Sequence, residues 1–190
     1  MIIYVAATSV VTSESLVQRG AVEHVVASMR ACDRHEGVQA QGCWALANLA
    51  TNSDTNSRII FESKGIDVII SAMRLFPANL SVQAKGCRGL GRIARHYEMS
   101  CGHIREHGGV EAVMQCMNLH KNSATVQQEG TIVLKTMAGE FLRGMGMNET
   151  DAMMPGLQPS WSPDQAGSSS TGARGLYGDR GEPLSTFSKA

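Results

Sequence analysis

The sequence predicts an all-α fold of three repeated helical units, and two observations carry that prediction. One stretch occurs three times at intervals of 44 residues, at 38–50 (VQAQGCWALANLA), 82–94 (VQAKGCRGLGRIA) and 126–138 (VQQEGTIVLKTMA). A fixed period of about 40–47 residues is typical of helical solenoids. Within each copy the apolar residues recur at spacings of three and four, which places them on one stripe of an α-helix.

Each unit is expected to begin with a short helix that a glycine terminates. These helices are predicted over 13–19, 57–64 and 100–107, and the glycines that follow are Gly20, Gly65 and Gly108. Glycine suits this position because it adopts the left-handed conformation that ends many helices. Ser13 is a candidate N-cap of the first helix.

A second helix is expected after each glycine, over 21–30, 66–75 and 110–119. Three methionines lie at the same position of these helices: Met29, Met73 and Met117. A methionine stripe can form a promiscuous groove, but three copies in register favour core, where methionine fills irregular gaps.

The third and longest helix of each unit follows a polar loop, at 31–37, 76–81 and 120–125. Ser81 and Thr125 are the expected N-caps, Thr125 with Gln128 as a capping box, and Gly37 is a poorer cap. A glycine recurs inside each helix, at Gly42, Gly86 and Gly130, where it costs about 1 kcal/mol against alanine. A cost repeated in phase indicates that another helix packs closely at this point.

The two ends of the chain differ from the repeats. Residues 1–12 are expected to be a remnant of a preceding repeat's third helix, because Leu46, Leu49 and Ala50 shifted by 44 fall on Ile2, Val5 and Ala6. The three units are placed at 13–54, 55–98 and 99–142. Residues 143–190 contain four of the five prolines and many glycines and serines, so they are expected to form a disordered tail.

Composition limits the classes of protein that the chain can belong to. Seventeen basic and seventeen acidic residues balance, so no overall field attracts nucleic acid. No apolar run reaches the roughly 18 residues of a membrane span. The five cysteines, two of them at the same repeat position, suit small buried hydrophobes in a reducing compartment. We therefore expect an intracellular protein of the cytoplasm or nucleus; a secretory signal in 1–11 is disfavoured because no basic flank accompanies it.

The order of elements and the 38–50 motif resemble the armadillo repeat. The residues that fall on that family's pattern are Gly42, Cys43, Trp44, Ala45, Leu46, Asn48, Leu49 and Ala50. The resemblance covers roughly residues 2–141, and the Gly-Cys pair is similar to armadillo arrays of long multidomain proteins, including leucine-rich-repeat kinases. It implies a right-handed superhelix of three-helix units whose third helices line a concave groove that binds extended peptides.

Positions one turn apart on each third helix give the candidate binding residues. They are Gln41, Trp44 and Asn48 in the first unit, Lys85, Arg88 and Arg92 in the second, and Glu129, Ile132 and Thr136 in the third. Three cations in the middle unit suit an extended partner segment that carries acidic residues. The alternative is a solvated charged face, with Trp44 filling a gap between units.

One branch of the family, importin-α, holds its ligand with a Trp and an Asn placed as Trp44 and Asn48 are. The equivalents in the next unit are Arg88 and Arg92, which would repel a basic nuclear-localisation signal. A nuclear-import receptor is therefore disfavoured, and so is a nucleic-acid binder, because no basic stripe extends beyond one unit.

No pattern in the sequence indicates catalysis. The run GCRGLGR lacks the terminal Lys-Ser/Thr of a phosphate loop, and the cysteines form no CxxC pair. His103 and His107, with Cys101 nearby, could share a metal, but the other units have nothing similar and solvated histidines are the favoured interpretation. The chain is expected to have no enzymatic activity, cofactor, metal or small-molecule substrate.

The predicted function is therefore protein–protein binding, as a scaffold or adaptor. The alternative is a targeting fragment of a larger, kinase-type multidomain protein.

Overall fold

The computed structural model describes residues 10–144, and over this range every regular element is a helix, as predicted. Residues 1–9 and 145–190 lie outside the described range, and with them most of the expected remnant and of the expected tail. The described helices are α2 (Val10–Gln18), α3 (Ala21–Ala31), α4 (Glu36–Leu49), α5 (Asp54–Glu62), α6 (Gly65–Leu75), α7 (Leu80–His96), α8 (Met99–Glu106), α9 (Gly109–Leu119) and α10 (Ala124–Gly144).

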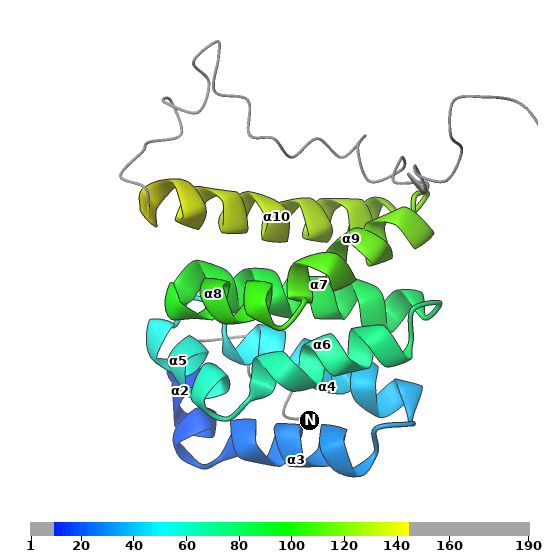
Figure 1. The fold of residues 1–190 in the computed structure, drawn as a ribbon. Coiled ribbons are helices and arrows are strands. Elements are labelled where there is room, and N and C mark those ends of the chain that lie inside the picture. The colour runs from blue at the N-terminus through cyan, green and yellow to red at the C-terminus, as the bar shows by residue number, and fades with distance from the viewer. Residues whose placement is uncertain (1–9, 145–190) are drawn as a thin grey trace, which may run out of the picture.

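The helices group by threes and stack in chain order. Figure 1 shows this order, from α3 at the bottom of the view to α10 at the top. The third helix of the middle group, α7, packs against α4 on one side and α10 on the other, while α6 contacts α3 and α9. One continuous cluster of buried apolar side chains runs through all three groups. Each group therefore buries its apolar stripe partly against its neighbour.

The first helix begins earlier than predicted. Residues 10–12 belong to α2, so the boundary drawn at residue 12 is wrong for them. Ser13 lies inside α2 and is buried, and its hydroxyl accepts a hydrogen bond of 3.3 Å from Nδ2 of Asn56 in the next group. Its role is thus to join two groups and not to cap a helix, which local sequence could not indicate.

The caps of the third helices all lie two residues before the predicted caps. The side chains of His35, Asn79 and Ser123 accept hydrogen bonds from the backbone amides of Val38, Val82 and Val126, at 3.3, 3.0 and 3.4 Å. Gly37, Ser81 and Thr125 consequently lie inside the helices. A cap side chain accepts a hydrogen bond from the backbone amide two or three residues after it. Here that amide belongs to the valine that begins the apolar stripe.

The joint between first and second helices uses the left-handed conformation at one position in every group. Gly20, Lys64 and Gly108 have φ angles of 79°, 63° and 73°. In the middle group the residue is therefore Lys64 and not the predicted Gly65. Gly65 is needed for another reason, because a Cβ atom there would lie 2.9 Å from the carbonyl oxygen of Ile60.

Substitutions at these two adjacent positions should have opposite effects on stability. Lys64→Gly should raise the free energy of unfolding by about 0.5–1 kcal/mol, because a side chain at positive φ is strained. Gly65→Ala should lower it by about 1–3 kcal/mol through overpacking. Urea denaturation followed by circular dichroism measures both values; a loss of stability in Lys64→Gly would contradict the assignment.

The recurring helix glycines do permit close packing, as predicted. A Cβ atom on Gly86 would lie 2.6 Å from Cγ of Met73, and one on Gly130 would lie 2.5 Å from Sδ of Met117. Gly42 meets Met29 in the same way. Met29 and Met73 are buried and Met117 partly so, which confirms that the methionine stripe is core.

A glutamine in each third helix ties down the end of the second helix. Nε2 of Gln83 donates hydrogen bonds of 2.7 Å to the carbonyl of Met73 and 3.0 Å to that of Phe76. Gln39 and Gln127 repeat this pattern, with the carbonyls ten and seven residues before them. The first carbonyl of each pair has no partner within its helix, so the amide satisfies it. The second also accepts a backbone amide in the loop, as that of Phe76 does from Asn79 at 3.1 Å.

The cysteines at the repeat position behave as buried hydrophobes, as predicted. Cys43 and Cys87 are fully buried and carry free thiols. Burial raises the pKa of Cys43 to about 12, so its thiol stays protonated and unreactive near neutral pH. Across residues 10–144, no helix has both the length and the apolar character needed to cross a membrane.

Candidate functional site

The nine predicted binding residues lie on three neighbouring helices. Gln41, Trp44 and Asn48 are on α4, Lys85, Arg88 and Arg92 on α7, and Glu129, Ile132 and Thr136 on α10. Because α7 packs between α4 and α10, the stacking brings residues from the three helices into contact. We call these nine residues the third-helix row.

The first contact in the row joins Lys85 to Trp44. The Lys85 ammonium lies 5.1 Å from the centre of the Trp44 ring, and both side chains are partly exposed. This is a cation–π geometry, worth roughly 0.5–1 kcal/mol at an exposed site. The contact holds a flat apolar surface beside a positive charge. Gln41, one turn away on α4, is exposed.

The second contact joins Arg88 to Glu129. Nε and Nη2 of Arg88 lie 2.7 and 2.6 Å from the same carboxylate oxygen of Glu129, and the side chains are 36% and 14% exposed. The carboxylate neutralises one of the three predicted cations. An acidic ligand that binds Arg88 must therefore compete with Glu129.

The third contact draws Arg92 away from solvent. Its Nη1 donates to the backbone carbonyl of Ala47 (3.2 Å), to Oδ1 of Asn48 (3.3 Å) and to the hydroxyl of Thr51 (2.6 Å). Burial, and then the charge of Arg88, lower the pKa of Arg92. Asn48 is only 6% exposed. Arg92 and Asn48 thus join α7 to α4, and a ligand that bonded Oδ1 of Asn48 would compete with Arg92.

The last residues of the row are less polar than their positions imply. The hydroxyl of Thr136 donates to the carbonyl of Ile132 one turn earlier, at 2.9 Å. Ile132 and Thr136 are both partly exposed. With three cations and one carboxylate, the row carries a net charge of about +2. Its accessible chemistry is one aromatic ring, one ammonium group, a paired guanidinium and an apolar end.

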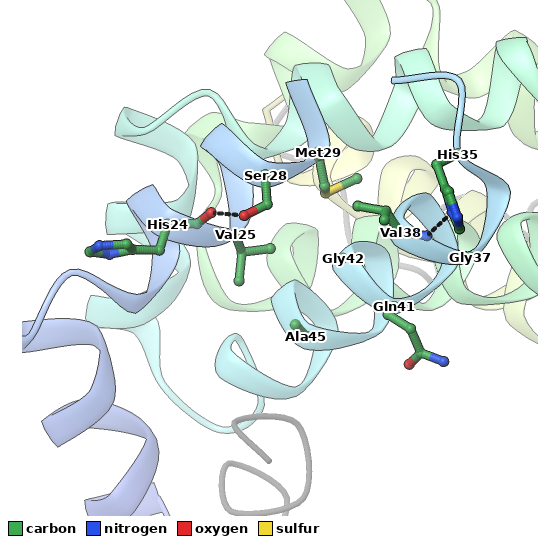
Figure 2. A pocket seen from close by; sticks show the side chains of 10 residues that line it. All are labelled: His24, Val25, Ser28, Met29, His35, Gly37, Val38, Gln41, Gly42 and Ala45. Atoms are coloured by element: carbon green, nitrogen blue, oxygen red, sulfur yellow. Dashed lines mark hydrogen bonds between the residues drawn. The ribbon is translucent and has the colours of Figure 1, made fainter. Parts of the chain in front are cut away.

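An apolar pocket of about 710 Å³ adjoins the row at Gln41. Figure 2 shows that Val25 and Met29 of α3 face Val38 and Gly42 of α4 across the pocket, while the Gln41 side chain points away from it. Shifted by 44 residues, Val25 and Val38 correspond to Ile69 and Val82, which are fully buried. The pocket therefore lies on the face that later groups bury against the group before them.

This pocket was not predicted from the sequence, although the apolar positions that line it were. The missing information was which positions have a neighbouring group to cover them. The signal that could have indicated it is at His24 and Ser28, which line the pocket and are exposed, while their counterparts Val68 and Ala72 are buried.

The potential metal ligands His103, His107 and Cys101, which are close in sequence, do not all lie together in the structure. Cys101 is buried, and its thiol donates to the carbonyl of Ala94. The residue that lies beside His103 and His107 is instead Asp67, which is 36 residues away from His103 in sequence.

Comparison with known proteins supports the fold and gives no function. No protein-family model and no curated protein matches the chain. Two crystal structures of engineered proteins from the Northeast Structural Genomics Consortium are similar to it. The first has a TM-score of 0.64 and 24% identity and covers 73% of this chain and 54% of its own. The second has a TM-score of 0.63 and 25% identity and covers 73% of this chain and 32% of its own. The chain thus spans about half of the first and a third of the second.

Proposed function

We propose that the chain is an armadillo-type helical solenoid that binds another protein, as a scaffold or adaptor. The 44-residue repeat, the three helices per group and the stacking in chain order support this proposal. The bound element is an extended segment that lies along the third-helix row, on the concave side of a right-handed superhelix. It acts without a cofactor, in the cytoplasm or nucleus.

The observation that carries the proposal is the contact between Trp44 and Lys85 across two helices. An aromatic ring beside an ammonium group offers an apolar partner side chain a flat surface and offers a carboxylate a charge-assisted hydrogen bond. An ammonium has three N–H donors, and contact with a ring face leaves them available to a ligand. The best ligand is therefore an apolar side chain followed or preceded by an acidic one.

The test begins with capture of partners by the full chain from a cell extract, identified by mass spectrometry, and continues with measured affinities. Trp44→Ala should weaken binding by about 2 kcal/mol, as expected for a central aromatic anchor, without changing the dependence on salt. Lys85→Glu should weaken binding and flatten that dependence, because it removes a charge attraction that salt screens.

Lys121→Glu is the matched control, because Lys121 is exposed in the loop between α9 and α10, outside the row. It changes the net charge by the same amount and should leave affinity nearly unchanged. The proposal is wrong if the double variant Trp44→Ala, Lys85→Glu stays folded and binds the captured partner as tightly as the original chain.

A second candidate is that the chain is a targeting module of a larger, kinase-type multidomain protein. The apolar pocket supports the part of this candidate that adds a further helical group, because a group stacked on α3 and α4 would cover Val25 and Val38 as the first group covers their counterparts in the second. Sequencing the full gene tests this candidate, since a catalytic domain encoded in the same reading frame is the expected result.

A further inference from the structure

Three potential metal ligands meet where the second group contacts the third. Asp67 comes from α6, His103 from α8, and His107 is the C-cap of α8. Their ligand atoms all lie within 4.8 Å of one another. Nε2 of His103 is 2.6 Å from Oδ1 of Asp67, and the two imidazole rings stack with centroids 3.7 Å apart. The set therefore brings two imidazoles and one carboxylate to one point.

Neighbouring groups hold both rings in place. Nδ1 of His107 lies 2.9 Å from the carbonyl oxygen of His103, and because a carbonyl only accepts, this nitrogen carries the proton. The lone pair of neutral His107 is then on Nε2, available to a metal. Phe61 packs edge-on against the His103 ring, with centroids 5.3 Å apart. For His107, such fixing of ring and tautomer by a neighbouring group is what metal-binding histidines require.

The contact between the first and second groups provides an internal comparison. Shifted by 44 residues, Asp67, His103 and His107 correspond to Glu23, Ile59 and Ser63. There the Ser63 hydroxyl donates to the Glu23 carboxylate at 3.1 Å. In both contacts between groups, an acidic residue of one group thus meets the end of the first helix of the next group. Of the two contacts between described groups, only the one between the second and third groups has two imidazoles in place of the serine and the isoleucine.

We propose that Asp67, His103 and His107 form a binding site for a divalent transition metal ion, best suited to Zn²⁺. Two imidazole nitrogens and a carboxylate oxygen are a common zinc ligand set, in which water completes the tetrahedron. A tetrahedral ion with bonds of about 2.0–2.1 Å separates its ligands by roughly 3.3 Å. Asp67 and His103 must therefore move apart slightly, and because the two imidazole rings lie in nearly parallel planes, 22° apart, the His107 ring must move inward and turn until both lone pairs point at the ion. The His103 proton moves from Nε2 to Nδ1 as the metal replaces it.

The site has room for the water ligands. A cavity of about 210 Å³ lies beside it, lined by Asp67, Ile70, Ser71, Arg74 and His107. Arg74 donates to the backbone carbonyls of His107 and Gly108, at 2.8 and 3.3 Å. This holds the end of α8 in place, but the guanidinium charge opposes a cation. The site should consequently bind zinc weakly enough to exchange it, and the bound ion would link the second group to the third.

Titration of the metal-free full chain with Zn²⁺ by isothermal calorimetry tests the proposal, with Co²⁺ as a spectroscopic substitute. We expect one saturable site per chain, a visible Co²⁺ spectrum of tetrahedral type and a higher melting temperature with metal. The double variant His103→Ile, His107→Ser, which installs the residues of the contact between the first and second groups, should abolish this site. Asp67→Asn and His107→Asn should each weaken binding at least about tenfold, as loss of a metal-site group does.

Two control variants identify other zinc-binding groups. His24 and Cys32 are exposed on the first group, and His24→Asn and Cys32→Ser should retain the affinity of the original chain. The exposed position of His107 means that His107→Asn should fold normally, so its result is decisive even if the double variant unfolds. The proposal is overturned if no 1:1 site is found, or if His107→Asn binds zinc unchanged.

Discussion

Leu90→Ala is expected to lower the free energy of unfolding by about 2–5 kcal/mol, the range for a buried leucine. Leu90 is completely buried in α7, the helix that packs between α4 and α10. Removing its side chain leaves a cavity with rigid walls on both sides, so little relaxation can fill it. Equilibrium urea denaturation at constant protein concentration measures the change.

The equivalent substitutions provide an ordered series. Leu46→Ala should cost a similar amount, because Leu46 is also completely buried. Leu134→Ala should cost less, because Leu134 on α10 is only partly buried. Leu80→Ala is the control on α7 itself, since Leu80 is largely exposed and its loss should change stability by less than about 0.5 kcal/mol. Equal effects of Leu90→Ala and Leu80→Ala would contradict the packing of α7.

Gln83→Met is expected to destabilise the chain by about 1–3 kcal/mol, although it replaces a polar residue by an apolar one of similar size. The amide of Gln83 is buried and satisfies the carbonyls of Met73 and Phe76 at the end of α6. Without this amide the Met73 carbonyl loses its hydrogen bond, whereas the Phe76 carbonyl keeps one from the Asn79 backbone amide. A buried carbonyl left without a hydrogen bond costs roughly 1–3 kcal/mol. The same denaturation experiment gives the value.

Gln128→Met is the matched control, because the substitution is chemically identical and Gln128 is exposed on α10. It should have almost no effect. Gln127→Met should lie between the two, since Gln127 makes the same pair of hydrogen bonds but is only partly buried. If Gln83→Met proves neutral, water or a rearranged helix end must satisfy the Met73 carbonyl, and the structural role assigned to this glutamine is wrong.

Much of the fold could be predicted because the repeat makes three copies of the same local information. Helical periodicity placed the second helices to within one residue, and the recurring Gly86 correctly indicated that another helix packs closely there, which the structure shows to be α6 at Met73. The caps were predicted less well. Ser81 and Thr125 are good capping residues, yet Asn79 and Ser123 act instead, because several capping residues stand in each loop and packing of the valine that follows selects one.

The candidate site was predicted at the level of position and not of interaction. Spacing along the helices placed Trp44, Lys85 and Arg88 on neighbouring third helices, as the structure has them. Whether the three cations are available to a partner or are bound by residues of the chain itself depended on contacts between groups. Arg88 meets Glu129 and Arg92 meets Asn48, so two of the three charges already have protein partners.

The sequence by itself determined the helical class, the 44-residue unit and the apolar stripe of each helix, because these follow from periodicity within a few turns. Only the tertiary structure decided which side chains meet across the joints between groups. Ser13 with Asn56, Arg88 with Glu129 and Asp67 with His103 are separated by 36 to 43 residues. Such contacts depend on how each group is rotated and displaced against the next, and that rotation results from the packing of all three helices together.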